Sequence, residues 1–273
     1  MSVKSGSRLP ALGRAYLAFC FVFLLLPIAT LIVFSFQRNQ YASIPGQGWS
    51  LRWYQKLFSD GSLLDALQAS LVVSPLAATG ACVVGFFAAY AIHRYRFRGR
   101  VALMLLIMTP MLIPALILGI GFLGLLSRFG LQGELYSVIL SHIVLVTAPA
   151  MALIQLRLSQ MPESLEEAAR NLGATEWQSL TRIVLPWALP GIAGGWILAF
   201  TFSFDEFVIA WFVCGFHPTL PVAIYAYIVG SADPSLNAMA AIIFLLSCVM
   251  LLCAELILAP FLADRRVEAP AVA

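Results

Sequence analysis

Two adjacent carboxylic acids, Asp205 and Glu206, interrupt an apolar stretch of the 273-residue chain. Placing an aspartate in the hydrocarbon core of a bilayer costs about 2.5–3.5 kcal/mol on insertion scales, so acids in such a stretch are candidate functional groups. Their negative charge suits a passing cation, and neighbouring aromatic rings add cation–π attraction for an amine. The alternative is a structural role for either acid, because successive helical residues point about 100° apart and only one can face a path squarely. The predicted cation path comprises Phe204, Asp205, Glu206, Phe207 and Trp211.

The remaining reactive side chains lack the spacing of a catalytic or metal site. The histidines His93, His142 and His217 are far apart in the sequence, and the five cysteines show no paired spacing. Ser141 neighbours His142, but adjacent helical residues diverge, so we interpret His142 as a membrane histidine with a hydrogen-bond partner. The sequence contains no GxSxG, HExxH or CxxC motif, and neither of its two lysines follows a glycine-rich phosphate-binding loop. We therefore predict no catalytic residue, metal or cofactor on this chain, and ATP hydrolysis on another chain.

The composition indicates a protein that crosses a membrane several times. Hydrophobic residues make up 61% of the chain and charged residues 11%, with a mean hydropathy of +0.92. Soluble domains are nearer half apolar and a quarter charged, so this composition excludes a soluble enzyme, a secreted disulfide scaffold and a disordered linker. The formal charge of +3 is too small to indicate a nucleic-acid-binding protein.

Six apolar runs are long enough to serve as membrane spans, each of which needs about 20 residues. We predict an all-α protein with one transmembrane domain over residues 1–273, whose first run is an uncleaved signal anchor. The predicted spans cover residues 15–36, 64–92, 101–126, 135–156, 188–212 and 237–262. Small residues in these runs would allow close helix contact, although ordinary membrane-helix composition also explains them; they are Gly80, Gly85, Gly191, Gly194 and Gly195.

The distribution of positive charge indicates how the chain is oriented. Twelve Lys and Arg residues lie before the first span, in 93–100, in 157–187 and after the last span, whereas four lie in the other connections. These two groups alternate across the predicted spans. By the positive-inside rule the richer side is cytoplasmic, which places both termini in the cytoplasm.

The 157–187 connection carries the signals of two short helices. Pro162 suits a first helical turn, and Gly173 suits the left-handed position that follows a helix. Thr175 and Gln178 have the spacing of a capping box for a second helix, which we expect to end at Pro186. Two helices divided by a glycine form a docking element rather than a flexible tether.

An apolar stripe on the first of these helices needs a covering surface. Leu165, Ala168, Ala169 and Leu172 recur at the spacing of one helical face. Either a partner protein covers this stripe or the chain packs it onto its own helix ends, and the pattern by itself leaves both possibilities open.

The same connection is similar to the EAA loop of permease subunits in ATP-binding-cassette (ABC) importers. The resemblance covers 20 residues, with the pattern EAA, three residues, G, nine residues, I-x-LP. It implies the type I importer permease fold and a coupling helix that sits in a groove of the ATPase subunit. In that arrangement small alanines permit close approach, the glycine makes the turn and the glutamate meets basic groups on the partner. The residues that carry the pattern are Glu167, Ala168, Ala169, Gly173, Ile183, Leu185 and Pro186.

A second likeness extends over nearly the whole chain and resembles the polyamine (spermidine/putrescine) branch of these permeases, specifically its second subunit. It runs through 203–208, 212–213, 219–221 and 234–238. The branch usually has two aspartates at 205–206, and it often has a basic residue within 222–232, where this chain has none. An importer of amino-phosphonates or other small amino compounds therefore stays open as an alternative, with iron or thiamine importers more distant.

The resemblance implies a set of partners in a bacterial inner membrane. We expect a second permease subunit in a heterodimer, two ATPase subunits that hold ATP and Mg, and a periplasmic binding protein. The binding protein would deliver substrate to the outer loops 37–63, 127–134 and 213–236. The rivals from other classes are a secondary transporter and a membrane-embedded enzyme or assembly factor that docks a cytosolic partner.

Overall fold

The computed structural model describes residues 11–39, 48–59, 61–230 and 234–263 of the chain. Within these ranges the regular structure is helical, and the β-pairing is a single isolated bridge between Gln37 and Trp49. The chain forms two compact units, Met1–Asp60 with Tyr227–Leu246 and Gly61–Ala226 with Ser247–Ala273. The helices α11 (Leu220–Gly230) and α12 (Ser235–Ala263) each contribute residues to both units.

The first unit contains α1 (Ala11–Ser35), which is long and apolar enough to cross a membrane, and the short α2 (Arg52–Ser59). Most apolar side chains of α1 are exposed, as expected for a helix surrounded by lipid. Polar contacts tie α2 to the end of α1. The hydroxyls of Ser35 and Tyr54 lie 2.7 Å apart, and the Trp53 indole Nε1 donates to the Gln37 carbonyl oxygen at 2.6 Å.

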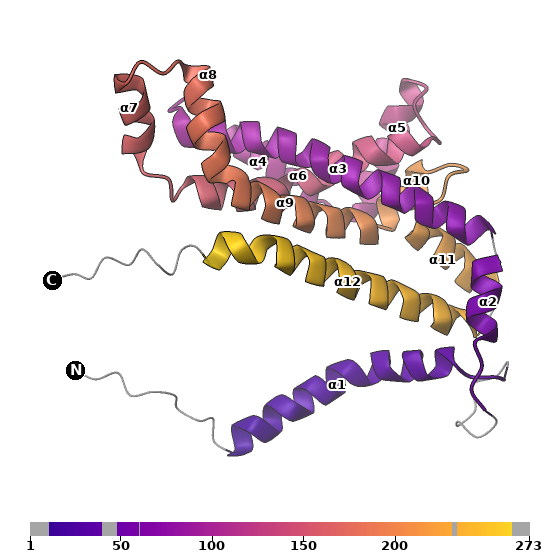
Figure 1. The fold of residues 1–273 in the computed structure, drawn as a ribbon. Helices are drawn as coiled ribbons and strands as arrows, with labels where there is room; N and C mark the ends of the chain where they lie inside the picture. Colours follow the sequence, from indigo (N-terminus) through magenta and orange to yellow (C-terminus); the bar gives the residue numbers. More distant parts are fainter. Residues whose placement is uncertain (1–10, 40–47, 60, 231–233, 264–273) are drawn as a thin grey trace. The chain divides into compact units, whose positions relative to one another are not determined.

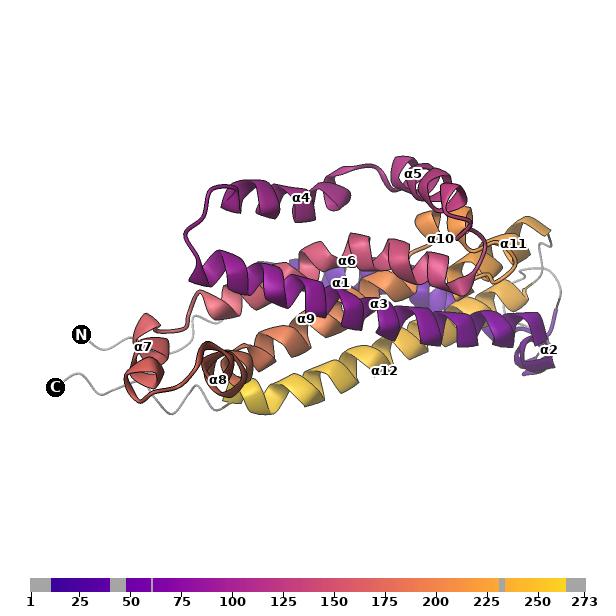
Figure 2. The same cartoon turned by 90° about the horizontal axis from the view of Figure 1, so that it is seen from above.

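The second unit is built around three long helices that run side by side (Figures 1 and 2): α3 (Gly61–Arg94), α6 (Leu135–Leu158) and α9 (Leu185–Asp205). The 157–187 connection lies at one end of this bundle, and α10 (Val208–Val213) lies toward the other end (Figure 1). The connection contains α7 (Glu163–Asn171), α8 (Glu176–Ser179) and a π-helical segment, Leu180–Val184.

Small residues let the backbones of these three helices approach closely. A Cβ atom added to Gly85 of α3 would lie 3.1 Å from the backbone nitrogen of Met151 in α6. One added to Gly195 of α9 would lie 2.9 Å from the carbonyl oxygen of Ala150, also in α6. Backbone atoms cannot move aside as the end of a flexible side chain can. The close helix contacts expected at Gly85 and Gly195 are therefore confirmed. Fully buried alanines complete the interfaces: Ala77, Ala78, Ala81, Ala89, Ala148, Ala150, Ala188 and Ala199.

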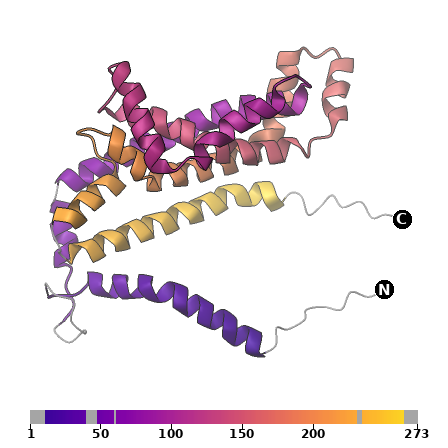
Figure 3. The same cartoon turned by 180° about the vertical axis from the view of Figure 1, so that it is seen from behind.

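The third predicted span, 101–126, is wrong as a continuous helix. The chain forms α4 (Arg100–Leu112) and α5 (Ala115–Arg128), which are bent by 107° relative to each other. Figure 3 shows this bend from behind. Pro114 explains the break, because its ring disfavours helical dihedrals at the preceding residue, and Ile113 accordingly adopts an extended conformation. The described residues therefore contain four helices that qualify as spans, or five if the bent pair is one span.

The expected helix end at Pro186 is also wrong. Helical structure continues from Glu176 to Asp205 through the π-helical segment. Within that segment the Leu185 N–H donates to the carbonyl oxygen of Leu180, five residues earlier. The wider turn relieves the clash between the proline ring and the preceding carbonyl groups, and it accommodates a residue that has no N–H to donate. The helix of the fifth predicted span, 188–212, ends at Asp205 rather than at residue 212.

Replacing Gly195 with alanine tests the close approach. The new methyl group must displace the Ala150 backbone, so we expect a loss of about 1–3 kcal/mol of stability, as is typical of overpacking. The matched control is Gly194→Ala, where the nearest neighbour of the new Cβ would be a Leu153 methyl carbon at 3.7 Å, an ordinary contact. Thermal unfolding of the detergent-solubilised subunit should show a clear decrease for Gly195→Ala and little change for Gly194→Ala. Equal midpoints for the two variants would contradict the packing described.

Candidate functional site

The first helix of the 157–187 connection begins and ends where its sequence signals predict. Pro162 occupies the N-cap position of α7, Leu172 the C-cap, and Gly173 follows with φ +86°. The Gly173 N–H donates to the carbonyl oxygen of Arg170 at 2.9 Å. A left-handed conformation is costly for a residue with a Cβ atom, so this turn needs the glycine. The predicted position of Gly173 after the helix is confirmed.

The capping box at the start of α8 is confirmed as well. The Gln178 N–H donates to the Thr175 hydroxyl oxygen at 3.2 Å, and the Thr175 N–H donates to the Gln178 side-chain oxygen at 2.9 Å. These reciprocal bonds satisfy donors that a helix N-terminus otherwise leaves free. The turn between α7 and α8 is therefore fixed by local contacts at Gly173, Thr175 and Gln178.

The predicted apolar stripe of α7 divides between two faces. Ala169 is 8% exposed and Glu166 is 5% exposed, so this face packs against the rest of the unit. Leu165 and Ala168 are exposed, and Leu172 is 89% exposed. The chain covers its own part of the stripe at Ala169 and leaves an apolar face open to a partner.

Glu166 joins α7 to the bundle through an ion pair that the sequence analysis did not predict. Its Oε2 lies 3.0 Å from Nε of Arg94, in the last turn of α3, and 3.8 Å from Nη2 of Arg170. The carboxylate lies near the N-terminus of α7 and the Arg94 guanidinium at the C-terminus of α3, so both helix dipoles favour the pair. The spacing of Glu166 and Arg170 is visible in the sequence as i and i+4, whereas the partnership with Arg94 depends on the fold.

The residues of the EAA pattern do not lie on one surface. Glu167 and Ala168 are exposed on α7, whereas Ala169 is buried. Ile183 belongs to the π-helical segment and is half-buried, and Leu185 and Pro186 open α9. The pattern therefore combines exposed residues of α7, the glycine of the turn (Gly173), and residues at the junction between the loop and α9.

The acid pair lies at the far end of α9, at a break rather than inside a helix. Asp205 is the last residue of α9, and its side chain is exposed. Glu206 follows in an extended conformation, and its Oε1 accepts a hydrogen bond from the Ile209 N–H at 2.8 Å. One acid thus caps the first turn of α10, while Asp205 has no hydrogen bond or ion pair to the other described residues. Glu206 stands one residue before the N-cap of α10, Phe207, and glutamate is not among the preferred N-cap residues, so the sequence alone does not indicate this bond.

Three aromatic rings cluster beside this break. The Phe207 ring centroid lies 5.8 Å from that of Trp211 and 4.8 Å from that of Tyr225 in α11, and the Trp211 and Tyr225 centroids lie 5.1 Å apart. Phe204 differs from the other predicted path residues because it is 3% exposed and stacks on Phe200. The sequence analysis missed Tyr225, which has no spacing relationship to the acid pair.

The interpretation of His142 as a membrane histidine with a hydrogen-bond partner is confirmed. Its Nδ1 lies 2.8 Å from the hydroxyl oxygen of Ser203, and the side chain is completely buried. The neighbouring Ser141 hydroxyl donates to the Ser137 carbonyl oxygen instead. The contact between His142 and Ser203 joins α6 to the last turn of α9, immediately before Asp205.

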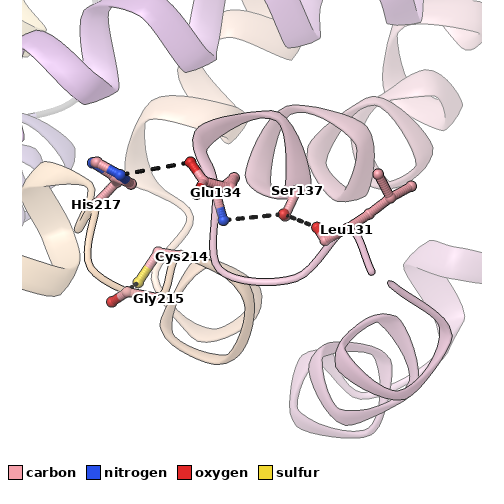
Figure 4. A network of polar contacts seen from close by, with 6 residues as sticks. All are labelled: Leu131, Glu134, Ser137, Cys214, Gly215 and His217. Atoms are coloured by element: carbon pink, nitrogen blue, oxygen red, sulfur yellow. Dashed lines mark hydrogen bonds and ion pairs between the residues drawn. The ribbon is translucent and has the colours of Figure 1, made fainter. Parts of the chain in front are cut away.

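Two of the predicted outer loops, 127–134 and 213–236, meet at the same end (Figure 4). His217 Nε2 lies 3.6 Å from the Glu134 carboxylate, and the Gly133 N–H donates to the Val213 carbonyl oxygen at 3.3 Å. A Cβ atom on Gly215 would lie 2.5 Å from both Cα and O of Gly133, so this approach requires glycine. The Ser137 hydroxyl donates to the Leu131 carbonyl oxygen and accepts from the Glu134 N–H, which closes the turn before α6.

Solved structures of ABC importers share this fold. A bacterial ABC transporter involved in import of the acidic polysaccharide alginate superposes with a TM-score of 0.66, at 18% sequence identity, over 93% of this chain and 94% of that chain. The MetNI methionine ABC transporter in an inward-facing conformation superposes with a TM-score of 0.63, at 20% identity, over 72% and 95%. At these identities the likeness concerns the fold.

Sequence relatives are more similar. The spermidine/putrescine transport system permease protein PotC of Escherichia coli K12 is 35% identical over 247 residues, covering 90% of this chain and 93% of that protein. The putrescine transport system permease protein PotI of the same strain is 35% identical over 231 residues, covering 82% of each. The profile of one family matches residues 81–266. This chain therefore belongs to the family of binding-protein-dependent transport system inner membrane components.

Proposed function

We propose that this chain is one permease subunit of a bacterial ABC importer that carries putrescine or spermidine into the cytoplasm. The substrate class is supported by the likeness to PotC and PotI, which are named for polyamine transport. It is also supported by the exposed Asp205 carboxylate and the aromatic cluster of Phe207, Trp211 and Tyr225, which suit an organic cation.

The observation that carries the importer function is the two-faced α7. One face is held to α3 by the ion pair of Glu166 and Arg94 and buries Ala169, and the other leaves Leu165, Ala168 and Leu172 exposed. An apolar helix face that is fixed on a rigid body suits a groove on an ATPase subunit. Glu167 is exposed beside this face and is placed to meet a basic group of that partner. ATP and Mg would be held by two such ATPase subunits.

The proposed arrangement in the membrane has six spans, with the bent pair of α4 and α5 as the third and α12 as the last. Both termini and the 157–187 loop are cytoplasmic, which is supported by the excess of Lys and Arg on that side. The 21 residues of α9 rise about 31 Å, roughly the thickness of the hydrocarbon core. The acid pair therefore lies toward the periplasmic side, where a binding protein would release substrate.

A second permease subunit would complete the path, since this chain contributes one wall at Asp205 and the aromatic cluster. Glu206 also contributes negative charge, but its Oε1 is engaged by the Ile209 N–H. Both acids should hold a cation weakly, because tight binding within a path slows release.

ATP binding would switch the paired subunits between inward-open and outward-open states by rigid-body motion.

Uptake of labelled putrescine into proteoliposomes tests the proposed function. The vesicles would contain this subunit with its partner permease, the ATPase subunits and the cognate binding protein. We expect uptake that requires ATP and the binding protein. Uptake without ATP would favour a secondary transporter, and competition by amino-phosphonates but not by polyamines would move the substrate to the alternative class.

Replacing Gly173 with valine tests the coupling loop. A non-glycine residue at φ +86° costs about 1–2 kcal/mol, so the turn should rearrange and displace α7. We expect ATP-dependent uptake to be lost while the subunit is still inserted. Gly99→Val is the matched control, because Gly99 has φ +99° and no atom within 4 Å of an added Cβ, and it lies outside both the coupling loop and the outer loops expected to meet the binding protein. Similar uptake by the two variants would count against the coupling role.

Neutralising the two acids separately tests their roles in the path. Asp205→Asn should raise the putrescine concentration needed for half-maximal uptake roughly threefold to tenfold, equivalent to about 0.7–1.4 kcal/mol of lost attraction. Glu206→Gln keeps an oxygen that accepts from the Ile209 N–H, so it removes charge and preserves the cap. We expect a smaller rise for this variant. If neither variant changes the concentration dependence, both acids are structural.

A further inference from the structure

Glu166 occupies an unusual place for a charged residue. Among the described residues it is the one carboxylate with less than a tenth of its surface exposed. It precedes the EAA pattern by one residue and faces the bundle, whereas Glu167 faces outward. Ion pairs with a desolvated partner are screened less by water and salt than pairs on an open surface. The Glu166 carboxylate is therefore a stiff point of attachment between α7 and its surroundings.

Of its two partners, Arg94 is the one that links α7 to a different element. Arg170 belongs to α7 and moves with it, so its 3.8 Å contact can hold the carboxylate in place but cannot transmit a displacement. Arg94 ends α3, and its Nε lies 3.0 Å from Glu166. The helix also packs against α8 and the π-helical segment, and its other buried side chain among those described is the small Ala169.

The helix that receives this contact reaches the other end of the unit. The hydroxyl oxygen of Ser70, near the start of α3, accepts from the Leu220 N–H at the start of α11, with a distance of 2.7 Å. Val73 of α3 packs in one buried cluster with Ile209 and Val213 of α10. Because α10 begins directly after the acid pair, α3 connects the Glu166 contact with the segment that carries the predicted path.

We propose that Glu166 is a positioning residue that transmits the movement of α7 to α3 through Arg94. This inference rests on the proposed function, since α7 would be moved by the docked ATPase subunits when they bind ATP. The contact converts a displacement of the docked helix into a displacement of α3, and α3 carries it to α10 and α11. Loss of either charge removes this link between α7 and α3 while leaving the ATPase-binding face of α7 in place.

The surroundings of the pair supply a matched control. A polar cavity of about 250 Å³ adjoins it and is lined by His93, Arg94, Arg96, Glu166, Glu167 and Arg170. Arg96 has the same charge as Arg94 and lines the same cavity, yet it makes no ion pair with Glu166. If positive charge in this region acted in a general way, Arg96→Gln would impair coupling as Arg94→Gln does. If the contact with Glu166 is what matters, Arg96→Gln has no effect.

The test is the number of substrate molecules imported per ATP hydrolysed by the complete reconstituted importer, with putrescine as the probe. Glu166→Gln and Arg94→Gln should each lower this ratio severalfold. ATP hydrolysis should continue, and Arg96→Gln should leave the ratio unchanged.

A purely structural pair predicts a different outcome. Its loss would reduce the amount of assembled complex, and uptake and hydrolysis would fall together with an unchanged ratio. The proposal is overturned if either single variant gives that result. The amount of assembled complex is quantified by co-purification. If the unsubstituted importer takes up putrescine without ATP hydrolysis, the proposed function fails instead, so the two failures are distinguishable.

Discussion

The close approach of the α3, α6 and α9 backbones is the constraint on which the second unit depends. At Gly85 and Gly195 no side chain separates one helix from the next, and buried alanines fill the remaining interfaces. Helices in lipid gain little from hydrophobic association, so they are held by such packing and by polar contacts between them. A bundle packed in this way moves as one body rather than by bending. It holds the 157–187 connection at one end and the acid pair at the other.

Polar groups are concentrated where this bundle meets other elements. The contact between His142 and Ser203 secures the last turn of α9, and Glu206 caps the helix that follows the break. At the opposite end Glu166 secures α7. Neighbouring acids therefore have separate tasks: Glu206 stabilises a turn while Asp205 is exposed, and Glu166 faces inward while Glu167 faces outward. One acid of each pair builds the site and the other is available to a ligand or partner.

Features that depend on a few consecutive residues were predictable from the sequence, and features that depend on distant residues were not. Gly173 and the Thr175–Gln178 capping box were predicted correctly because a turn and a cap are closed by their own neighbours. The break at Pro114 had a local signal that the apolar run concealed. The π-helical turn before Pro186 also has a local cause in the proline, but the same sequence signal suits a helix that ends and a helix that continues through a wider turn. The pairing of Arg94 with Glu166 and the position of Tyr225 required the fold, since neither has a fixed sequence spacing to its partners. Family resemblance supplied the importer architecture that composition alone left open.

The central claim is that the ATPase-facing loop and the end that carries the acid pair belong to one rigid body. Spin labels at Trp177, in the loop but outside the α7 face proposed to meet the ATPase, and at Phe216, in the segment after α10, would report the distance between these ends, because both side chains are exposed. We predict one narrow distance distribution that is the same in the ATP-free and ATP-bound states of a transport-competent complex. A shift of more than about 5 Å, the rise of one helical turn, would contradict the account.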